Sequence, residues 1–452
     1  MTTTAPKLWQ TKGGLDAEVE AYTVGDDYLL DARLLPHEVY GSIAHAAGLV
    51  KAKLLTADEF IQVRDALKRL LLNPGDFKVT PGQEDIHTAV EQHLTEKLGP
   101  VGAKVHTGRS RNDQVQTDLR LYMKERLLHL HGMVCEASEA WAAFGRKHEK
   151  TLIPGYTHLQ RAMPTTVGHW AASHSEALLE NARTLASAYD DVDCSPLGSA
   201  AGYGAPLPLD RDYTAALMGF SRVQRNTLRV QTSRPRIEAC VLSALALLAR
   251  DLGVMAEDVV LYATAEFGFL KLDSSFTTGS SIMPQKRNPD VVELTRAKAA
   301  LFPGWLQQVL AVGAVSSGYH RDYQVTKGTL FLALDTARQM VDMMLALPSR
   351  LTVNAERCAL AVTEDMLATQ KALDLARRGV PFREAYRQVA DAARKHSGAA
   401  GAKGAKLPDY PGAPGNPGFE ELAKERSEAT AWSGAERDLL YGAWGKLLKI
   451  RP

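Results

Sequence analysis

The chain has 452 residues, of which 45% are hydrophobic and 23% charged, as is typical of folded globular proteins. Its length predicts about three domains, or fewer large ones. Its formal net charge of +1 excludes both the strongly basic surface of a nucleic-acid-binding protein and a strongly acidic surface.

The sequence carries no sign of export or membrane insertion. The N-terminal stretch MTTTAPKLWQTKGG is polar and lacks the apolar region of a signal peptide. The longest uncharged apolar run near the middle, residues 239–249, is shorter than the ~20 residues of a membrane span. Cys135, Cys194, Cys240 and Cys358 form no C-x-x-C pair, so we interpret them as buried reduced thiols. These features predict a cytoplasmic protein.

Helical patterns dominate, and alternating runs of β-branched residues are rare. The N-terminal part predicts short helices at residues 36–49, 56–72 and 83–98, with a turn at Asn73-Pro74-Gly75. Longer helices are then predicted at residues 120–150, 168–190, 236–272, 291–312 and 328–347.

The long helices predict an extended bundle. The segment 236–272 is apolar on most sides and free of proline, which is typical of a helix buried by neighbouring helices. Helices this apolar also suggest an oligomer. After about Asn354 the pattern changes to an amphipathic helix at 382–396, a Gly/Ala/Pro-rich loop at 397–418 and a last helix at 435–448.

Common catalytic motifs are missing from the sequence. It contains no G-x-x-x-x-G-K-[ST], no G-x-G-x-x-G after a strand, no H-E-x-x-H and no G-x-S-x-G. His87 and His93 are six residues apart on a predicted helix, so they face different directions and form a poor metal pair. Any chemistry is therefore expected to come from side chains without a metal or nucleotide.

Four polar, irregular segments are rich in groups that bind carboxylates. They are EDIHTAVE (84–91), KVHTGRSRNDQVQTD (104–118), PGYTHLQRAMP (154–164) and TTGSSIMPQKRNPD (277–290). In the second, arginines precede a long helix that Asn112 or Asp113 could cap, which predicts an anion site at a helix N-terminus. The alternative is a solvated cap with exposed arginines.

The third and fourth segments carry candidate acid–base groups. Pro154-Gly155 ends the preceding helix, and His158 in the break could present an imidazole to a cleft, although a lone histidine is usually structural. In the fourth, a serine hydroxyl is a poor base at neutral pH, but Lys286, loop amides and the positive end of the next helix could stabilise its alkoxide. The alternative here is a plain interhelical loop.

GSSIMPQKRNPD resembles the signature of the fumarase/aspartase superfamily, whose members eliminate fumarate from succinyl compounds. HTGRSRNDQVQTDLRL and PGYTHLQRAMP, together with Gln285, resemble the argininosuccinate lyase family in particular. EDIHTAVE and YTVGDDYLLD are similar to that family as well, and VPFREAYRQV matches it more weakly. The resemblance runs from about Val24 to Lys327, and several segments in the family's order argue against a chance match.

The resemblance implies an all-α, three-domain fumarase/aspartase-like fold with a long central helix bundle that forms a homotetramer. We place an N-terminal helical domain at residues 1–107, the central bundle at 108–354 and a C-terminal helical domain at 355–452. Each active site would take segments from three chains. The implied reaction is the reversible elimination of fumarate from argininosuccinate to give arginine, in arginine biosynthesis. No cofactor, metal, nucleic acid or membrane is implied.

Three residues match the catalytic groups of the family. Ser280 corresponds to the base that removes the Cβ proton, and Ser281 is the less favoured candidate. His158 corresponds to the histidine that serves, directly or through water, as proton donor to the leaving nitrogen. Glu293 corresponds to a carboxylate that orients this histidine. Which of Ser280 and His158 is acid and which is base stays open from sequence, and we favour the serine as base.

The resemblance also implies residues that bind the substrate. Lys286, Asn288 and residues of the second and third segments match carboxylate-binding groups, and Arg234 matches an arginine that affects the architecture of the site. The full set is Ser110, Arg111, Asn112, Thr157, Lys286, Asn288, His87, Arg234, Tyr319, Gln324 and Lys327.

The chain departs from the family pattern at the arginine end of the site. Many relatives have a serine near position 27, whereas this chain has Asp26-Asp27, and an acidic group there could pair with the guanidinium. Pro235 follows Arg234 where an aspartate is common, and QVTK replaces a more acidic stretch. These departures concern substrate contacts rather than the elimination chemistry.

Two other functions fit a chain of this kind. A relative could release fumarate from another amino compound such as adenylosuccinate, but Gln285 and TGRSRNDQ argue against it. A crystallin-like structural protein could be built on the same fold, but the retention of Ser280, His158, Lys286 and Glu293 argues against a loss of activity.

Overall fold

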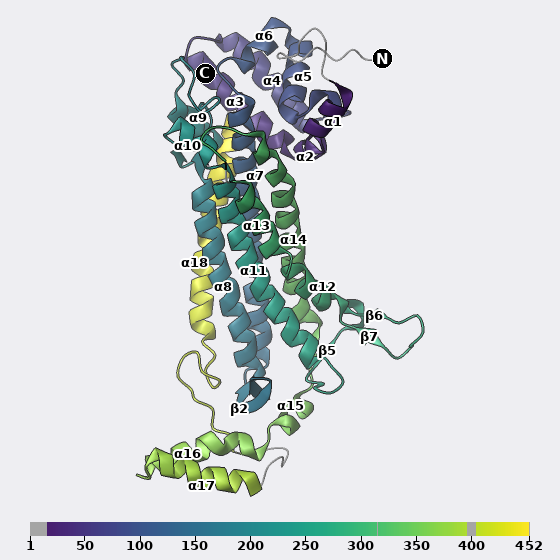
Figure 1. Ribbon diagram of the computed structural model, residues 1–452. Helices are drawn as coiled ribbons and strands as arrows, with labels where there is room; N and C mark the ends of the chain where they lie inside the picture. Colours follow the sequence, from purple (N-terminus) through teal and green to yellow (C-terminus); the bar gives the residue numbers. More distant parts are fainter. Residues whose placement is uncertain (1–15, 314, 396–403, 452) are drawn as a thin grey trace.

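The computed structural model describes residues 16–313, 315–395 and 404–451. Long helices pack side by side into an extended bundle (Figure 1). These are α7 (Arg111–Lys147), α8 (Val167–Val192), α11 (Arg234–Tyr262), α14 (Thr326–Ala346) and α18 (Phe419–Leu447). The prediction of an all-α chain with a long central bundle is confirmed.

Most shorter helices gather at the two ends of the bundle, whereas α12 and α13 lie along its side against α11 (Figure 1). Helices α1 to α6 lie at one end, and α15 to α17 lie at the other. Their bounds are α1 (Ala17–Val24), α2 (Asp27–Asp31), α3 (Leu35–Lys51), α4 (Ala57–Leu72), α5 (Ile86–Leu98), α6 (Pro100–Ala103), α9 (Arg211–Met218), α10 (Thr227–Thr232), α12 (Asp290–Ala299), α13 (Phe302–Val312), α15 (Ala355–Ala361), α16 (Ala368–Arg377) and α17 (Phe382–Lys395).

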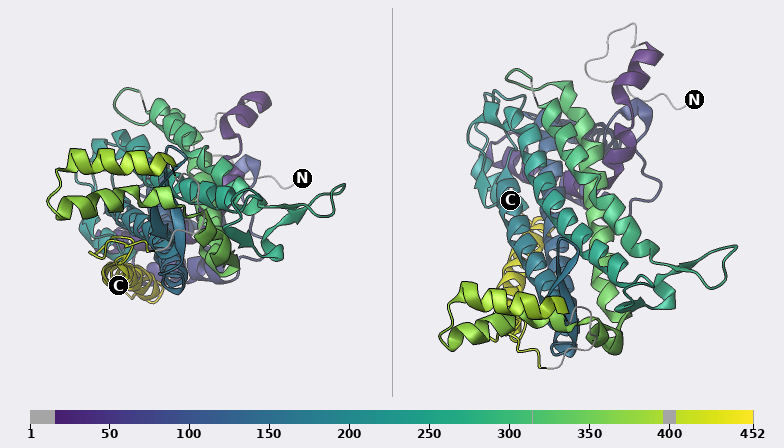
Figure 2. Two further views of the ribbon diagram at one scale, coloured as in Figure 1. Left: turned by 90° about the horizontal axis from the view of Figure 1, so that it is seen from below. Right: turned by 60° about the horizontal axis from the view of Figure 1, so that its bottom comes forward.

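The strands are short and form separate two-stranded pairs within the described residues. The antiparallel hairpin of β6 and β7 projects from the side of the bundle in each view of Figures 1 and 2. The strands are β1 (Leu152–Thr157), β2 (Gln160–Thr166), β3 (Cys194–Ser195), β4 (Arg222–Val223), β5 (Leu270–Leu272), β6 (Thr278–Gly279), β7 (Arg287–Asn288) and β8 (Leu351–Val353).

Helix α11 is the core of the bundle. It contacts α8, α12, α13 and α14, and most of its apolar side chains are buried among them. Of the described helices, only α11 is long and apolar enough to cross a membrane by length and composition, with a mean hydropathy of 1.8. Because 61% of that window is buried inside the protein, these properties are those of a core helix.

The start of α7 differs from the prediction. Ser110, rather than Asn112 or Asp113, caps the helix: its Oγ accepts a hydrogen bond from the Asn112 amide at 3.3 Å. The Asp113 carboxylate in turn accepts from the Ser110 amide at 3.1 Å, which completes a capping box. This reciprocal pair satisfies donors that the first turn of a helix otherwise leaves free.

Four predicted helices have different bounds. The helix predicted at 120–150 is α7, which begins at Arg111 and ends at Lys147. The segment 291–312 is two helices, α12 and α13, because Pro303 in the first turn of α13 cannot continue a helix. The segment 236–272 ends as a helix at Tyr262, and its last residues form β5, which pairs with β8. The last helix, α18, begins at Phe419 instead of residue 435.

The part of the 397–418 segment that is described, from Gly404 to Gly418, contains no helix or strand, in agreement with the predicted loop. Its first residues, 397–403, lie outside the described residues. The four cysteines are free thiols. Cys135 and Cys358 are buried as predicted, whereas Cys194 and Cys240 are partly exposed.

His45 on α3 makes the N-terminal end of the bundle sensitive to acid. Its Nε2 lies 3.0 Å from the Thr107 carbonyl, and burial together with nearby Arg109 lowers the pKa of His45 from 6.5 to about 3. Below pH 6.5 the unfolded chain therefore binds a proton that the folded chain does not.

We expect the free energy of unfolding to fall by up to about 1.4 kcal/mol per pH unit from this group as pH drops from 6.5. Urea unfolding at pH 7 and pH 5, at one fixed protein concentration, measures the loss. His45→Gln should lose less stability over this range than the parent chain. An equal loss in both proteins would contradict the assignment to His45.

Candidate active site

A pocket of about 300 Å³ opens at the α1–α6 end of the bundle. Its wall combines acidic and basic side chains, so it suits a ligand that carries both charges. Seven of the predicted site residues line it: His87, Arg111, Asn112, Arg234, Tyr319, Gln324 and Lys327. Segments from four distant parts of the sequence therefore meet at one place.

Lys327 is held as a cation on one wall of the pocket. Its Nζ pairs with Asp31 and lies 3.2 Å from Asp27 Oδ1. Burial alone would lower the pKa of Lys327, but the two carboxylates outweigh it, and the pKa is raised. Asp31 also accepts a hydrogen bond from the Ile86 amide at 3.2 Å, which ties α2 to the start of α5.

The departure at Asp26-Asp27 has a structural explanation. Asp26 is exposed, whereas Asp27 lines the pocket beside Lys327. Burial raises the pKa of Asp27, and Lys327 opposes this shift. In this chain the acidic side chain at position 27 therefore has a lysine partner within the pocket wall.

Arg234 lies against two aromatic rings. Its guanidinium carbon lies 5.7 Å from the ring centroid of Tyr319 and 5.6 Å from that of Tyr323. Pro235 lies in the first turn of α11 and offers no charge. Glu238 is buried one helical turn after Arg234. The charge of Arg234 lowers the pKa of Glu238, but burial outweighs this effect and raises the pKa to about 7.

Gln324 joins two segments of the pocket wall. It belongs to the 3-10 turn Arg321–Val325, and its Nε2 donates to the carbonyls of Thr23 at 3.0 Å and Val24 at 3.1 Å. This links the turn before α14 to the C-terminal end of α1. The side-chain amide of Gln324 is thus already used to hold the wall together.

Arg111 and its neighbours close the pocket near α5. Arg111 Nη1 lies 3.1 Å from Glu84 Oε2 and 3.6 Å from Asp85 Oδ2. Ser110, just before it, is occupied in capping α7. The first and second polar segments of the sequence therefore meet through this ion pair.

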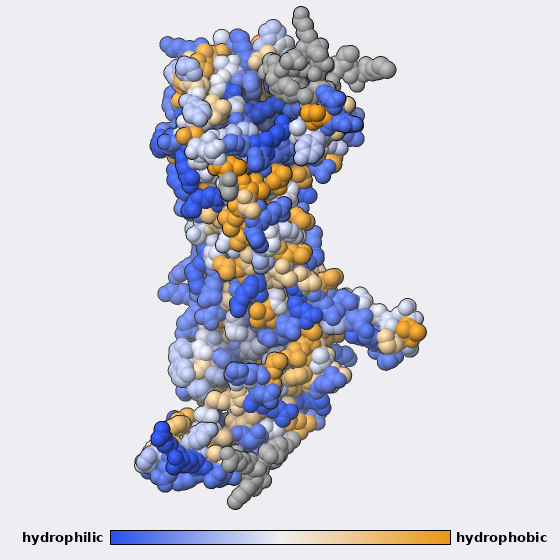
Figure 3. All heavy atoms as spheres, in the orientation of Figure 1, coloured by the Kyte–Doolittle hydropathy of each residue, from blue (hydrophilic) through white to orange (hydrophobic). Residues whose placement is uncertain are grey.

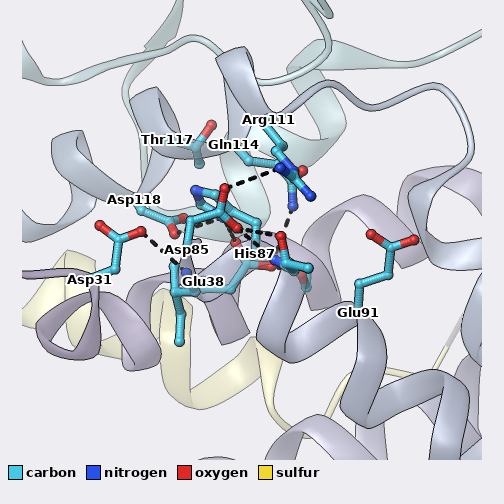
Figure 4. A network of polar contacts seen from close by, with 12 residues as sticks. Asp31, Glu38, Asp85, His87, Glu91, Arg111, Gln114, Thr117 and Asp118 are labelled. Atoms are coloured by element: carbon cyan, nitrogen blue, oxygen red, sulfur yellow. Dashed lines mark hydrogen bonds and ion pairs between the residues drawn. The ribbon is translucent and has the colours of Figure 1, made fainter. Parts of the chain in front are cut away.

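His87 lies over a buried polar network, which Figure 4 shows from close by. Its Nδ1 is 2.7 Å from Glu38 Oε2 and 3.7 Å from Asp118 Oδ2. Burial alone would lower the pKa of His87, but Glu38 and Asp85 outweigh it and raise the pKa. Sequence analysis did not single out Glu38, Asp118 or Glu238.

The β6–β7 hairpin presents Ser280. Its Oγ accepts hydrogen bonds from the backbone amides of Ile282 at 3.3 Å and Met283 at 3.1 Å. Lys286 is exposed in the same turn, and Asn288 is placed by pairing of β7 with β6. One hairpin therefore carries a hydroxyl, a cation and an amide, and Glu293 follows it in the first turn of α12.

His158 lies at the tip of the β1–β2 hairpin, where the sequence predicts only a break after a helix. Thr157 pairs with Gln160, so His158 and Leu159 form a two-residue turn with φ values of 55° and 57°. This left-handed geometry is the one that hairpin turns favour, but it costs roughly 1–3 kcal/mol for each residue other than glycine. Thr157 and His158 are exposed.

One chain does not bring these groups together. The pocket lies at the α1–α6 end, the β1–β2 hairpin at the opposite end, and the β6–β7 hairpin projects sideways between them (Figures 1 and 2). Among the described residues, Ser280, His158 and Glu293 therefore lie away from the pocket residues.

Comparison with known proteins places the chain in a family. A family model described as lyase matches residues 12–304. The argininosuccinate lyase of Thermotoga neapolitana is 40% identical over 85% of this chain and 98% of its own length. That of Sorangium cellulosum is 44% identical over 85% of this chain and 90% of its own length. The chain belongs to the argininosuccinate lyase family.

Solved structures share the fold of this chain. EDDS lyase in complex with formate is 25% identical, with a TM-score of 0.81 over 96% of this chain and 95% of that one. Class II fumarase from Schistosoma mansoni is 14% identical, with a TM-score of 0.67 over 86% of this chain and 97% of that one. At this identity the fumarase shows the shared fold alone.

Proposed function

We propose that this protein is an argininosuccinate lyase, which eliminates fumarate reversibly from argininosuccinate and releases arginine. The observation that carries the proposal is the identity of 40% and 44%, over 85% of the chain, to the argininosuccinate lyases of Thermotoga neapolitana and Sorangium cellulosum. The charged pocket supports it, because argininosuccinate carries ammonium, guanidinium and carboxylate groups together.

Ser280 is the proposed base. Its oxygen takes the proton from Cβ, and the electron pair of that C–H bond delocalises toward the neighbouring carboxylate. The amides of Ile282 and Met283 support this role, because donors directed at a hydroxyl oxygen stabilise negative charge on it. Lys286 and Asn288, on the same hairpin, bind a carboxylate of the succinyl part.

His158 is the proposed acid. As the electron pair forms the double bond of fumarate, the Cα–N bond breaks and the imidazole gives a proton, directly or through water, to the departing guanidinium nitrogen. Glu293 orients the imidazole, and Ser110, Arg111, Asn112 and Thr157 bind substrate oxygens. His87, Arg234, Tyr319, Gln324 and Lys327 complete the binding pocket. In the reverse reaction the same two groups exchange roles.

We also propose that the enzyme is a cytoplasmic homotetramer in which each site combines the pocket of one chain with the β1–β2 and β6–β7 hairpins of two others. Support comes from apolar side chains that helices of the bundle leave in water, among them Leu247 on α11, Leu310 on α13 and Leu332 on α14. Figure 3 shows hydrophobic residues gathered along the middle of the face that is turned to the viewer, where α11, α13 and α14 lie in Figure 1. A second copy would cover them.

A spectrophotometric assay tests the function. Purified protein is mixed with argininosuccinate, and the ultraviolet absorbance of fumarate is followed. We expect fumarate release with argininosuccinate and none with adenylosuccinate in a parallel reaction. Release only from adenylosuccinate would favour the related lyase, and no release from either would favour a crystallin-like structural protein.

A further inference from the structure

We propose that Glu38 is a positioning residue that acts through His87: it holds the imidazole by Nδ1 as a cation, so that Nε2–H is directed to a carboxylate of the substrate. This inference rests on the proposed function and adds a residue that does not touch the substrate. It assigns a role to the buried network beneath the pocket.

Three helices bring the network together. Glu38 of α3, His87 of α5 and Asp118 of α7 are each buried, with exposures of 0%, 4% and 1%. The 2.7 Å contact between His87 Nδ1 and Glu38 Oε2 is the shortest that the imidazole makes in this network (Figure 4). A charge-assisted hydrogen bond of this length fixes the plane of the ring and keeps Nδ1 protonated.

The other carboxylate oxygen of Glu38, Oε1, is also hydrogen-bonded. Oε1 accepts from Ser42 Oγ at 2.5 Å, and Gln114 Nε2 lies 3.5 Å away. Ser42 Oγ in turn accepts from Arg109 Nη1 at 2.9 Å. The carboxylate therefore cannot rotate away from His87 without breaking contacts to α3, α7 and the loop before α7.

The surrounding charges keep Glu38 and His87 ionised. Burial alone would raise the pKa of Glu38, but His87 and Arg109 outweigh it and lower the pKa to about 2. Burial and the charge of Glu38 raise the pKa of Asp118 well above its usual value, so Asp118 keeps its proton to higher pH. Asp85 and Asp31 also face His87 and favour its charged form.

The second ring nitrogen of His87 is left for a ligand. His87 lines the pocket, and its buried Nε2 has no hydrogen-bond partner among the described residues. A buried donor without a partner is unfavourable, and a substrate carboxylate would supply the missing acceptor. With Nδ1 bound to Glu38, the ring offers this donor in one fixed direction.

A bound metal ion explains the cluster less well. One ligand atom each from Glu38, His87 and Asp118 lies within 4.8 Å of the others, which would allow a metal by spacing. However, Arg109 Nη2 lies 3.7 Å from Glu38 Oε1, so a cationic group already faces the carboxylate. A divalent ion beside it would meet like charge.

The test replaces Glu38 by glutamine, which keeps the shape and removes the charge. Loss of the neighbouring negative charge lowers the pKa of His87, so the alkaline limb of kcat/KM should move to lower pH in Glu38→Gln. We expect KM for argininosuccinate to rise and kcat/KM at pH 8 to fall by about tenfold or more. Glu38→Asp keeps the charge and should retain the parental pH profile.

A double-mutant cycle separates positioning from general damage. If Glu38 acts through His87, then Glu38→Gln should cause little further loss in a His87→Asn background. The matched control is Glu125→Gln, because Glu125 Oε2 on α7 pairs with His37 Nε2 on α3 at 3.1 Å outside the pocket. This control should leave the pH profile unchanged.

A titration by NMR with labelled histidine gives a readout without turnover. The resonance absent from His87→Asn identifies His87, and its pKa should be lower in Glu38→Gln. The proposal is overturned if the pKa of His87 and the alkaline limb of kcat/KM are unchanged in a tetrameric Glu38→Gln protein. It is also overturned if the losses of kcat/KM from Glu38→Gln and His87→Asn multiply in the double variant. Should the parent enzyme release no fumarate at all, the proposed function fails, while the titration still tests the Glu38–His87 pair.

Discussion

Ser280→Ala should abolish turnover while leaving the oligomer intact. The substitution removes the proposed base, and general acid–base catalysis contributes about 10²–10⁴-fold to a rate. The fold should survive because Ser280 lies on a projecting hairpin whose strand pairing uses Thr278, Gly279, Arg287 and Asn288. Fumarate release at saturating argininosuccinate measures the loss, and size-exclusion chromatography checks the assembly.

The neighbouring serine provides a matched control. Ser281 is exposed in the same turn, so Ser281→Ala makes the same chemical change one residue away. We expect it to keep most of the activity. A Ser280→Ala protein with a near-normal rate, or a larger loss from Ser281→Ala, would refute the assignment of the base.

Two inactive variants should restore activity when they share a tetramer. We pair Ser280→Ala with His158→Asn, because asparagine tolerates the left-handed backbone of this turn better than most residues. If each site takes the two hairpins from different chains, about a quarter of the sites in a random equal mixture have both groups intact. Co-expression with two purification tags, followed by the fumarate assay, measures the recovery.

A second mixture tests the geometry behind this result. Ser280→Ala and Asn288→Ala alter the same β6–β7 hairpin, so every site in their mixed tetramers receives one defect or the other. This mixture should show about the mean of the activities of its two parents, with no recovery above the more active one. Equal recovery in both mixtures, or none in the first, would contradict a site built from separate chains.

The sequence predicted the parts of the fold that depend on local pattern. Periodicity placed α8 and α14 to within about two residues, and the turn at Asn73-Pro74-Gly75 follows α4 as predicted. Pro303 was visible in the sequence but its effect was missed, because the apolar pattern continues on both sides of it. The early start of α18 was missed because its first half is polar, with Glu, Lys, Arg and Ser in succession.

Tertiary contacts explain what the sequence could not predict. Seven of the pocket residues were predicted from motifs. Glu38 and Asp118 were missed because their partner, His87, lies far away along the chain. The β1–β2 hairpin was missed because its two strands have proline and glycine, which weaken a strand pattern. These residues form strands because they pair with each other across the turn, and the local sequence pattern does not show this pairing.

The left-handed turn at His158-Leu159 bears on how the subunits associate. Glycine at position 159 would remove the steric strain of that residue, but it would also let the turn adopt many more conformations. Leucine at this position has a strained backbone conformation. It also restricts the orientations of the His158 imidazole in the free chain. In the proposed tetramer, less conformational entropy would then be lost when chains associate, so the restricted turn would favour assembly.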